Sequence, residues 1–326
     1  MLVRLSLRTL CVAAVAIGTV APAVIEAAGY RTANFVIEAP SERLARQIGD
    51  AAEQYRHDLA IEWTGKPLPR WSRPCPITAQ VAPNLGAGGA TSFVFDRGEV
   101  FNWTMTIQGS EERILDSVLP HEITHTIFAS HFRQPLPRWA DEGACTTVEH
   151  PVERARQHRM LIEFLRTGRG IAFPEMFAMR EYPADVLPLY AQGYSLARYL
   201  IERGGRRRYV AFVGDGLNSD NWAAALSRHY GVNDLGNLQQ TWLSWVKQGC
   251  PAPPAAVAAA VPEPAGWSPT ARGQSPDPLP GRPAARPGRL ATTTSRQSIY
   301  VLQARRSQRQ EGGIPTAAAA PSVTRR

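Results

Sequence analysis

Two histidines and a glutamate, in the order His121-Glu122-Ile123-Thr124-His125, are the residues of this 326-residue chain whose spacing most directly suggests chemistry. In a helix, positions 121 and 125 lie one turn apart on the same face, where two imidazoles can bind one Zn²⁺. Glu122 lies on the neighbouring flank, where its carboxylate can take a proton from water that a metal has made acidic. A chain of this composition contains about 0.01 such patterns by chance.

The neighbouring residues favour a metal site over two surface histidines. Leu119, Ile123 and Ile127 form an apolar stripe beside both imidazoles, where polar rings without a ligand cost free energy. The sequence therefore predicts one zinc ion, bound by His121 and His125.

A tetrahedral catalytic zinc site needs a third protein ligand and leaves its fourth position to water. Glu142 is one candidate, because it follows the proline-containing loop Gln134–Pro137 and can fold back onto the first helix. His131 is the other, ten residues after His121, as in the H-E-x-x-H-x-x-G-x-x-H metallopeptidases. Phe128 stands where that pattern has a helix-breaking glycine, and in an unbroken helix His131 is turned by about 80° from His121.

Three segments in this order carry a resemblance to a known family: HEITH (121–125), PRWADEGA (137–144) and LYAQGYSLARYL (189–200). They resemble the gluzincin metallopeptidases, particularly the peptidase MA-like group related to thermolysin and to the zinc aminopeptidases. The resemblance spans roughly Val100–Val246. It implies zinc ligation by His121, His125 and Glu142, with Glu122 as general base and Tyr190 as the hydrogen-bond donor to the oxyanion.

Two departures from the family pattern bear on specificity and on the site. The zinc aminopeptidases carry G-x-M-E-N upstream to hold the substrate's amino terminus, whereas residues 86–90 read GAGGA and lack Met-Glu-Asn. An endopeptidase is therefore expected rather than an aminopeptidase. Cys145 stands where the second motif has alanine, and we expect a buried structural thiol there. Asp141 could orient a ligand histidine or lie at the surface.

The apolar periodicity predicts an α+β fold, with a small N-terminal sheet and helices over 29–110 and a mainly helical, zincin-like half over 111–250. Expected strands are 33–39, 77–81, 92–95 and 100–107, the last two paired through a turn at Asp96-Arg97-Gly98. A flexible turn is expected at 86–89, and a helix at 41–58 capped by Ser41. Expected helices after residue 111 are 152–167, 190–203, 209–213, 222–229 and 235–247. The free edge of strand 100–107 could pair with an extended substrate.

The two ends of the chain differ from its middle. Residues 1–28 have two arginines, a short apolar run and small residues, which predicts a cleaved signal peptide and a secreted, periplasmic or cell-envelope protein without stable membrane insertion. Residues 251–326 contain 13 of the 27 prolines and ten arginines, which predicts a disordered basic tail that could contact anionic surfaces. The remaining residues, 29–250, are near neutral, which argues against nucleic-acid binding. Cleavage leaves Cys75, Cys145 and Cys250, two of which could pair.

The function expected from these patterns is a secreted zinc metallopeptidase acting on peptides or proteins. One alternative is a zinc-binding envelope protein that keeps the gluzincin fold without hydrolysing peptides. The other is a metzincin-type peptidase with His131 as third ligand.

Overall fold

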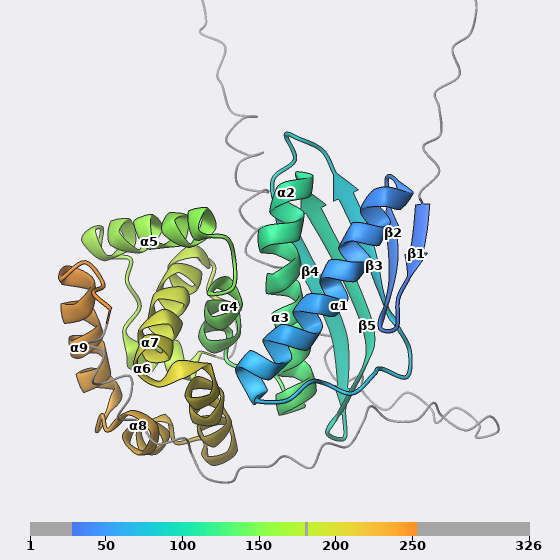
Figure 1. Cartoon of the computed structure of the whole chain (residues 1–326). Helices are drawn as coiled ribbons and strands as arrows, with labels where there is room; N and C mark the ends of the chain where they lie inside the picture. Colours follow the sequence, from blue (N-terminus) through green and yellow to red (C-terminus); the bar gives the residue numbers. More distant parts are fainter. Residues whose placement is uncertain (1–27, 180–181, 253–326) are drawn as a thin grey trace, which may run out of the picture.

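The computed structural model describes residues 28–179 and 182–252 (Figure 1). The predicted signal peptide, apart from Ala28, and the predicted tail, apart from residues 251 and 252, lie outside the described residues. Within these two ranges, no helix combines the length and apolar character needed to cross a bilayer.

Five strands form one mixed sheet in the order β1-β2-β3-β5-β4. The strands are β1 (Ala28–Arg31), β2 (Phe35–Ala39), β3 (Cys75–Val81), β4 (Gly88–Asp96) and β5 (Glu99–Gly109). The three inner strands run parallel, and each outer strand pairs antiparallel to its neighbour. Side chains along β3 and β5 alternate between buried and exposed, so one face of the sheet is covered and the other meets solvent.

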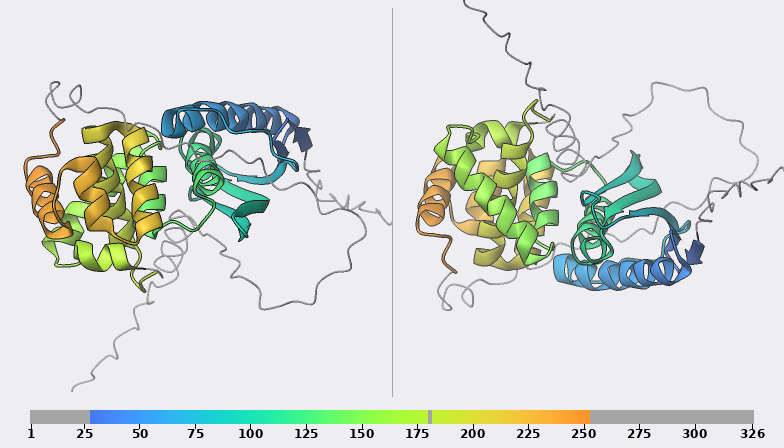
Figure 2. Two further views of the ribbon diagram at one scale, coloured as in Figure 1. Left: turned by 90° about the horizontal axis from the view of Figure 1, so that it is seen from below. Right: turned by 90° about the horizontal axis from the view of Figure 1, so that it is seen from above.

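Helices α1 (Glu42–Thr64) and α3 (Leu119–Phe132) cover one face of the sheet (Figure 2). Ser41 caps α1 as predicted, since its hydroxyl accepts a hydrogen bond from the amide of Leu44. The short helix α2 (Glu111–Arg113) and a π-helical turn, η1 (Ile114–Val118), lead directly into α3. Pro120 follows this π-helical turn and has no N–H to donate, and the carbonyl of Leu115, five residues earlier, accepts a hydrogen bond from the hydroxyl of Tyr55.

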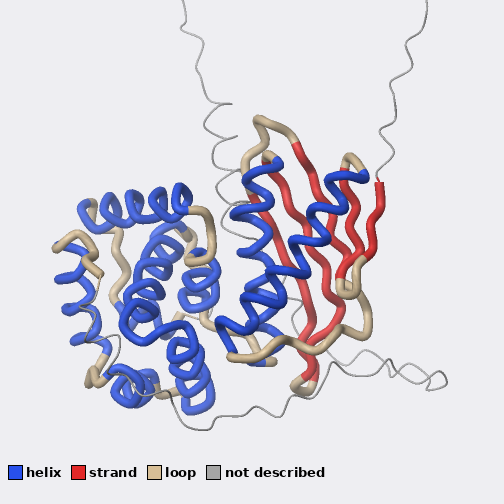
Figure 3. The backbone as a smooth tube through the Cα atoms, in the orientation of Figure 1, coloured by secondary structure: helices blue, strands red, loops and turns tan. Residues whose placement is uncertain are grey.

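The remaining helices pack together beside α3 and form the second half of the fold (Figure 3). They are α4 (Arg138–Thr146), α5 (Pro151–Arg166), α6 (Phe173–Ala178), α7 (Leu187–Ser219), α8 (Trp222–Tyr230) and α9 (Leu235–Lys247). A small N-terminal sheet with helices, followed by a mainly helical half, confirms the predicted α+β class.

The hairpin in the sheet was predicted correctly, but the strand with a free edge was not. Strands β4 and β5 pair through the turn at Arg97 and Gly98, both with positive φ. Strand β5, which covers the predicted 100–107 strand, is hydrogen-bonded on both sides, so the expectation that its edge is free is wrong. The edge strand beside β5 is β4, which begins at Gly88 and includes part of the segment expected to be a turn.

The predicted helices 190–203 and 209–213 are one kinked helix, α7. Gly205 interrupts it with φ 76° and ψ 168°, a conformation that glycine adopts readily. The glycines at 204 and 205 resemble a helix end in the sequence, but the chain resumes its helical path directly afterwards.

Candidate metal centre

Helix α3 is buried around its whole circumference at the H-E-x-x-H segment. Every side chain from Leu119 to Ala129 is buried, because the sheet lies on one side of α3 and α4 lies on another. The rings of His121 and His125 are 4.9 Å apart and inclined by 71°. Both residues are at most 1% exposed, so they are not surface histidines.

Glu142, on the first turns of α4, meets both imidazoles. Its Oε2 lies 3.5 Å from Nε2 of His121 and 3.7 Å from Nε2 of His125. A tetrahedral zinc ion with bonds of about 2.1 Å would hold its ligand atoms about 3.4 Å apart. Glu142 Oε2 is buried and has no hydrogen-bond partner among the described residues, as is typical of an oxygen that binds a cation.

Carboxylates also face the other ring nitrogens. Glu149 Oε1 lies 2.6 Å from Nδ1 of His121, and Asp141 Oδ1 lies 3.0 Å from Nδ1 of His125. A carboxylate at Nδ1 fixes the proton there and directs the lone pair of Nε2 to the opposite side, toward Glu142. The sequence suggested Asp141 for this role but missed Glu149, which lies seven residues after Glu142, just beyond the end of α4.

Four carboxylates are buried in this centre: Glu122, Asp141, Glu142 and Glu149 are all at most 3% exposed. Burial alone would lower the pKa of His121, but the carboxylates of Glu142 and Glu149 outweigh it and raise that pKa well above its ordinary value. Burial would raise the pKa of Glu142, yet the two imidazoles lower it. Buried carboxylates are stabilised by positive charge beside them, which a divalent cation bound here would supply.

Cys145 adds a sulfur to this centre. One ligand atom each from His121, His125 and Cys145 lie within 4.8 Å of one another, a buried cluster that could hold a metal ion. The sulfur lies 3.3 Å from Nδ1 of His125, the nitrogen that Asp141 also faces. The two Nε2 atoms instead face Glu142, so a metal bound between both imidazoles meets the carboxylate. Cys75, Cys145 and Cys250 are all buried thiols in the structure.

His131 lies six residues beyond His125 on the same helix. Helix α3 continues unbroken past Phe128, as expected for a segment without the glycine. The ring of His131 packs edge-on against Phe132, and the His121–His125–Cys145 cluster does not include it. Burial, with Lys66 nearby, lowers the pKa of His131 to about 4.

The carboxylate of Glu122 is held by strand β4. Thr91 donates a hydrogen bond of 2.7 Å from Oγ1 to Oε2 of Glu122, and both side chains are fully buried. Gly89 leaves room for the other oxygen, because a Cβ at that position would come within 2.5 Å of Oε1. Burial raises the pKa of Glu122, although the two imidazoles oppose the rise. Neither Thr91 nor Gly89 was singled out from the sequence.

Two tyrosines approach the centre from the helical half. Tyr190, on α7, is 1% exposed, and its hydroxyl donates to the hydroxyl of Tyr182 over 3.4 Å. Tyr182 donates in turn to Oε1 of Glu142 over 3.2 Å. Burial raises the pKa of both phenols, so both stay protonated donors at neutral pH. Tyr182 was not predicted, because it belongs to a loop without a motif.

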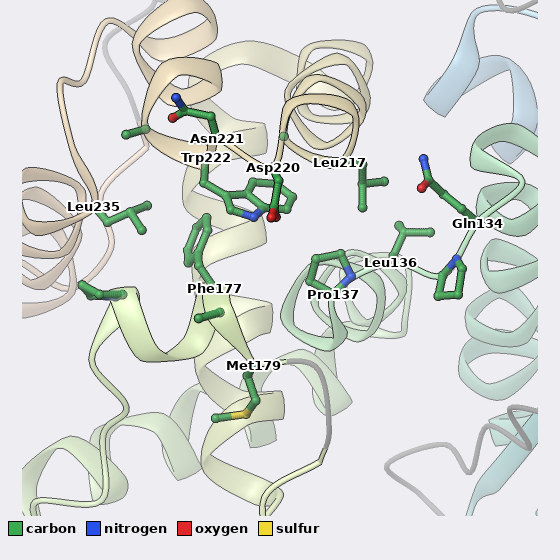
Figure 4. Close-up of a pocket in the computed structure, with 15 residues that line it drawn as sticks. Gln134, Leu136, Pro137, Phe177, Met179, Leu217, Asp220, Asn221, Trp222 and Leu235 are labelled. Atoms are coloured by element: carbon green, nitrogen blue, oxygen red, sulfur yellow. The ribbon is translucent and has the colours of Figure 1, made fainter. Parts of the chain in front are cut away.

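A separate pocket of about 860 Å³ lies between the loop before α4, helix α6 and the start of α8 (Figure 4). Pro137, Phe177, Leu217 and Trp222 contribute to its lining, and the histidines, Glu142 and the tyrosines described above do not.

A comparison with models of known protein families gives no match, and a comparison with curated proteins gives none either.

Proposed function

We propose that this protein is a zinc-dependent metallopeptidase of the gluzincin type. The observation that carries the proposal is the position of Glu142 Oε2, within 3.7 Å of the Nε2 atoms of both motif histidines. His121, His125 and Glu142 would hold one Zn²⁺, a His₂Glu set that occurs in catalytic zinc sites. The intact H-E-x-x-H glutamate favours hydrolysis over a purely structural metal.

The residues around the metal have roles in peptide hydrolysis. Zinc bound there would polarise the scissile carbonyl and make a water more acidic. Glu122 accepts the proton of the attacking water and passes it to the leaving amine. Thr91 occupies Oε2 of Glu122, which leaves Oε1 for this proton transfer. Tyr190 would turn its O–H from Tyr182 to the substrate's carbonyl oxygen as negative charge develops there, while Tyr182 keeps its own hydrogen bond to Glu142.

The substrate would lie along β4, the edge strand that carries both Thr91 and Gly89. An extended peptide can add to such an edge through main-chain hydrogen bonds, which requires no particular side chain. This arrangement suits an endopeptidase acting on peptides or proteins. The N-terminal segment 1–28 favours a secreted or envelope location for this activity.

Metal analysis and hydrolysis of a mixed peptide library by the full-length protein test the proposal. We expect about one zinc per chain, lost in His121→Ala, and a rate at least about 100-fold lower in Glu122→Gln with the zinc retained. His131→Gln is the matched control and should keep both zinc and hydrolysis.

Two results would contradict the proposal. If His131→Gln loses zinc while Glu142→Gln keeps it, the ligand set is that of a metzincin. If the wild-type protein holds zinc but cleaves no peptide in the library, it is a zinc-binding protein without peptidase activity.

A further inference from the structure

Tyr182 lies between Tyr190 and the acidic residue of the metal centre. Its hydroxyl accepts a hydrogen bond from Tyr190 and donates one to Oε1 of Glu142. The two phenol rings are nearly parallel, with centroids 6.1 Å apart and an angle of 22°. The rings therefore form a short stack that ends at the carboxylate.

Arg138 fixes the other side of this stack. Its guanidinium carbon lies 4.5 Å from the centroid of the Tyr182 ring, within cation–π distance. Arg138 begins α4, the helix that also carries Glu142. Tyr182 is thus held against α4 at both ends of its side chain, by Arg138 at the ring and by Glu142 at the hydroxyl.

The two oxygens of Glu142 consequently have different surroundings. Oε2 faces the Nε2 atoms of His121 and His125, whereas Oε1 accepts the hydrogen bond from Tyr182. A carboxylate with one oxygen engaged by a neutral donor presents the other to a cation, and such outer contacts tune metal affinity. The phenol can supply this bond without adding charge to the centre.

We propose that Tyr182 is a positioning residue that holds Glu142 as a one-oxygen metal ligand. This inference rests on the ligand set of the proposed function, but not on peptide hydrolysis. Tyr182 and Tyr190 thereby have separate tasks: Tyr182 holds Glu142 directly, whereas Tyr190 contacts Tyr182.

Zinc affinity of the full-length protein, measured by competition with a chelator, tests this division. Tyr182→Phe removes only the hydroxyl and should raise the zinc dissociation constant about 10- to 100-fold. Tyr190→Phe should change that constant by about threefold at most, because the hydroxyl of Tyr190 donates to Tyr182 and thus lies one hydrogen bond further from Glu142. Tyr199→Phe, a buried tyrosine of α7 that packs against Trp245, is the control for loss of a phenol elsewhere.

The visible spectrum of the Co²⁺-substituted protein provides a second readout that altered stability would not mimic. If Glu142 is released to bind through both oxygens in Tyr182→Phe, the coordination number rises and the absorption weakens relative to wild type. Unchanged zinc affinity in Tyr182→Phe overturns the inference, and so does an equal loss in Tyr190→Phe. A protein that binds zinc in this Tyr182-dependent way but cleaves no peptide contradicts only the proposed function.

Discussion

The backbones of Gly143 and Gly193 lie in direct contact where α4 crosses α7: a Cβ on Gly143 would come within 2.3 Å of the carbonyl oxygen of Gly193. The same modification of Gly193 would bring a Cβ within 2.8 Å of the carbonyl oxygen of Trp139. These glycines belong to the two motifs that carry the family resemblance. Their absent side chains let α4 approach α7 closely, and this approach sets the position of Glu142.

Alanine at either glycine should therefore disturb both the fold and the metal centre. We expect Gly143→Ala to lower stability by about 2–3 kcal/mol, because backbone atoms cannot move aside as a flexible side chain can. That corresponds to a melting temperature lower by about 5–10 °C, together with weaker zinc binding. Gly214→Ala on α7 is the matched control, since its Cβ would meet only a ring atom of Phe132 at 3.7 Å. Equal melting temperatures for the two variants would refute this explanation of the crossing.

Removing the carboxylate at Nδ1 of His121 should weaken the metal without removing a ligand. Glu149→Gln is expected to raise the zinc dissociation constant about 10- to 100-fold, because the ring loses the partner that orients it and raises its basicity. Chelator competition measures this. Glu153→Gln serves as control, because Glu153 is a nearby buried acid whose partner is Arg113. If both variants bind zinc equally well, Glu149 has no role in orienting His121.

The hydrogen bond from Thr91 to Glu122 should matter for turnover and not for metal content. Thr91→Val keeps the shape but loses the hydroxyl, and we expect kcat to fall about 10-fold or more. Thr91→Ser retains the donor and should recover most of the rate. Steady-state kinetics with a library-derived peptide, alongside zinc analysis, provides the measurement; a valine variant as active as wild type would exclude this role.

Stability should depend on pH through His131. Its pKa of about 4 in the fold is below its ordinary value of 6.5, so the unfolded chain takes up a proton first as pH falls. The contribution of His131 to the free energy of unfolding is fully present above about pH 6.5. It is lost progressively as the pH falls to about 4, by about 3 kcal/mol in total. Urea unfolding at several pH values should show a smaller loss in His131→Gln. An equal loss of stability in the wild-type protein and in His131→Gln would exclude His131 as the group responsible.

Local patterns in the sequence predicted much of the fold. The cap at Ser41, the hairpin turn at Arg97 and Gly98, and the helices near 152–167, 222–229 and 235–247 depend on neighbouring residues, and the structure contains them. The order of strands in the sheet depends on pairing between distant segments. The free edge was therefore assigned to the wrong strand.

The metal centre likewise combines residues that are adjacent in the sequence with residues from distant segments. The H-E-x-x-H segment is recognisable because its residues are adjacent, and Glu142 was found through a second motif. Thr91, Glu149 and Tyr182 reach the centre from three other segments, and each is an ordinary polar residue where it stands in the sequence. Only the assembled fold reveals what they contact.

The burial of α3 between the sheet and the helical half has a consequence for assembly. A cation held by α3 and α4 would act as a cross-link between two parts of the chain, in addition to their packing and to the hydrogen bonds and ion pairs that already join them. Loss of the ion would leave the buried carboxylates repelling one another at the boundary between α3 and α4. The metal would therefore contribute to the cohesion of the two halves as well as to chemistry.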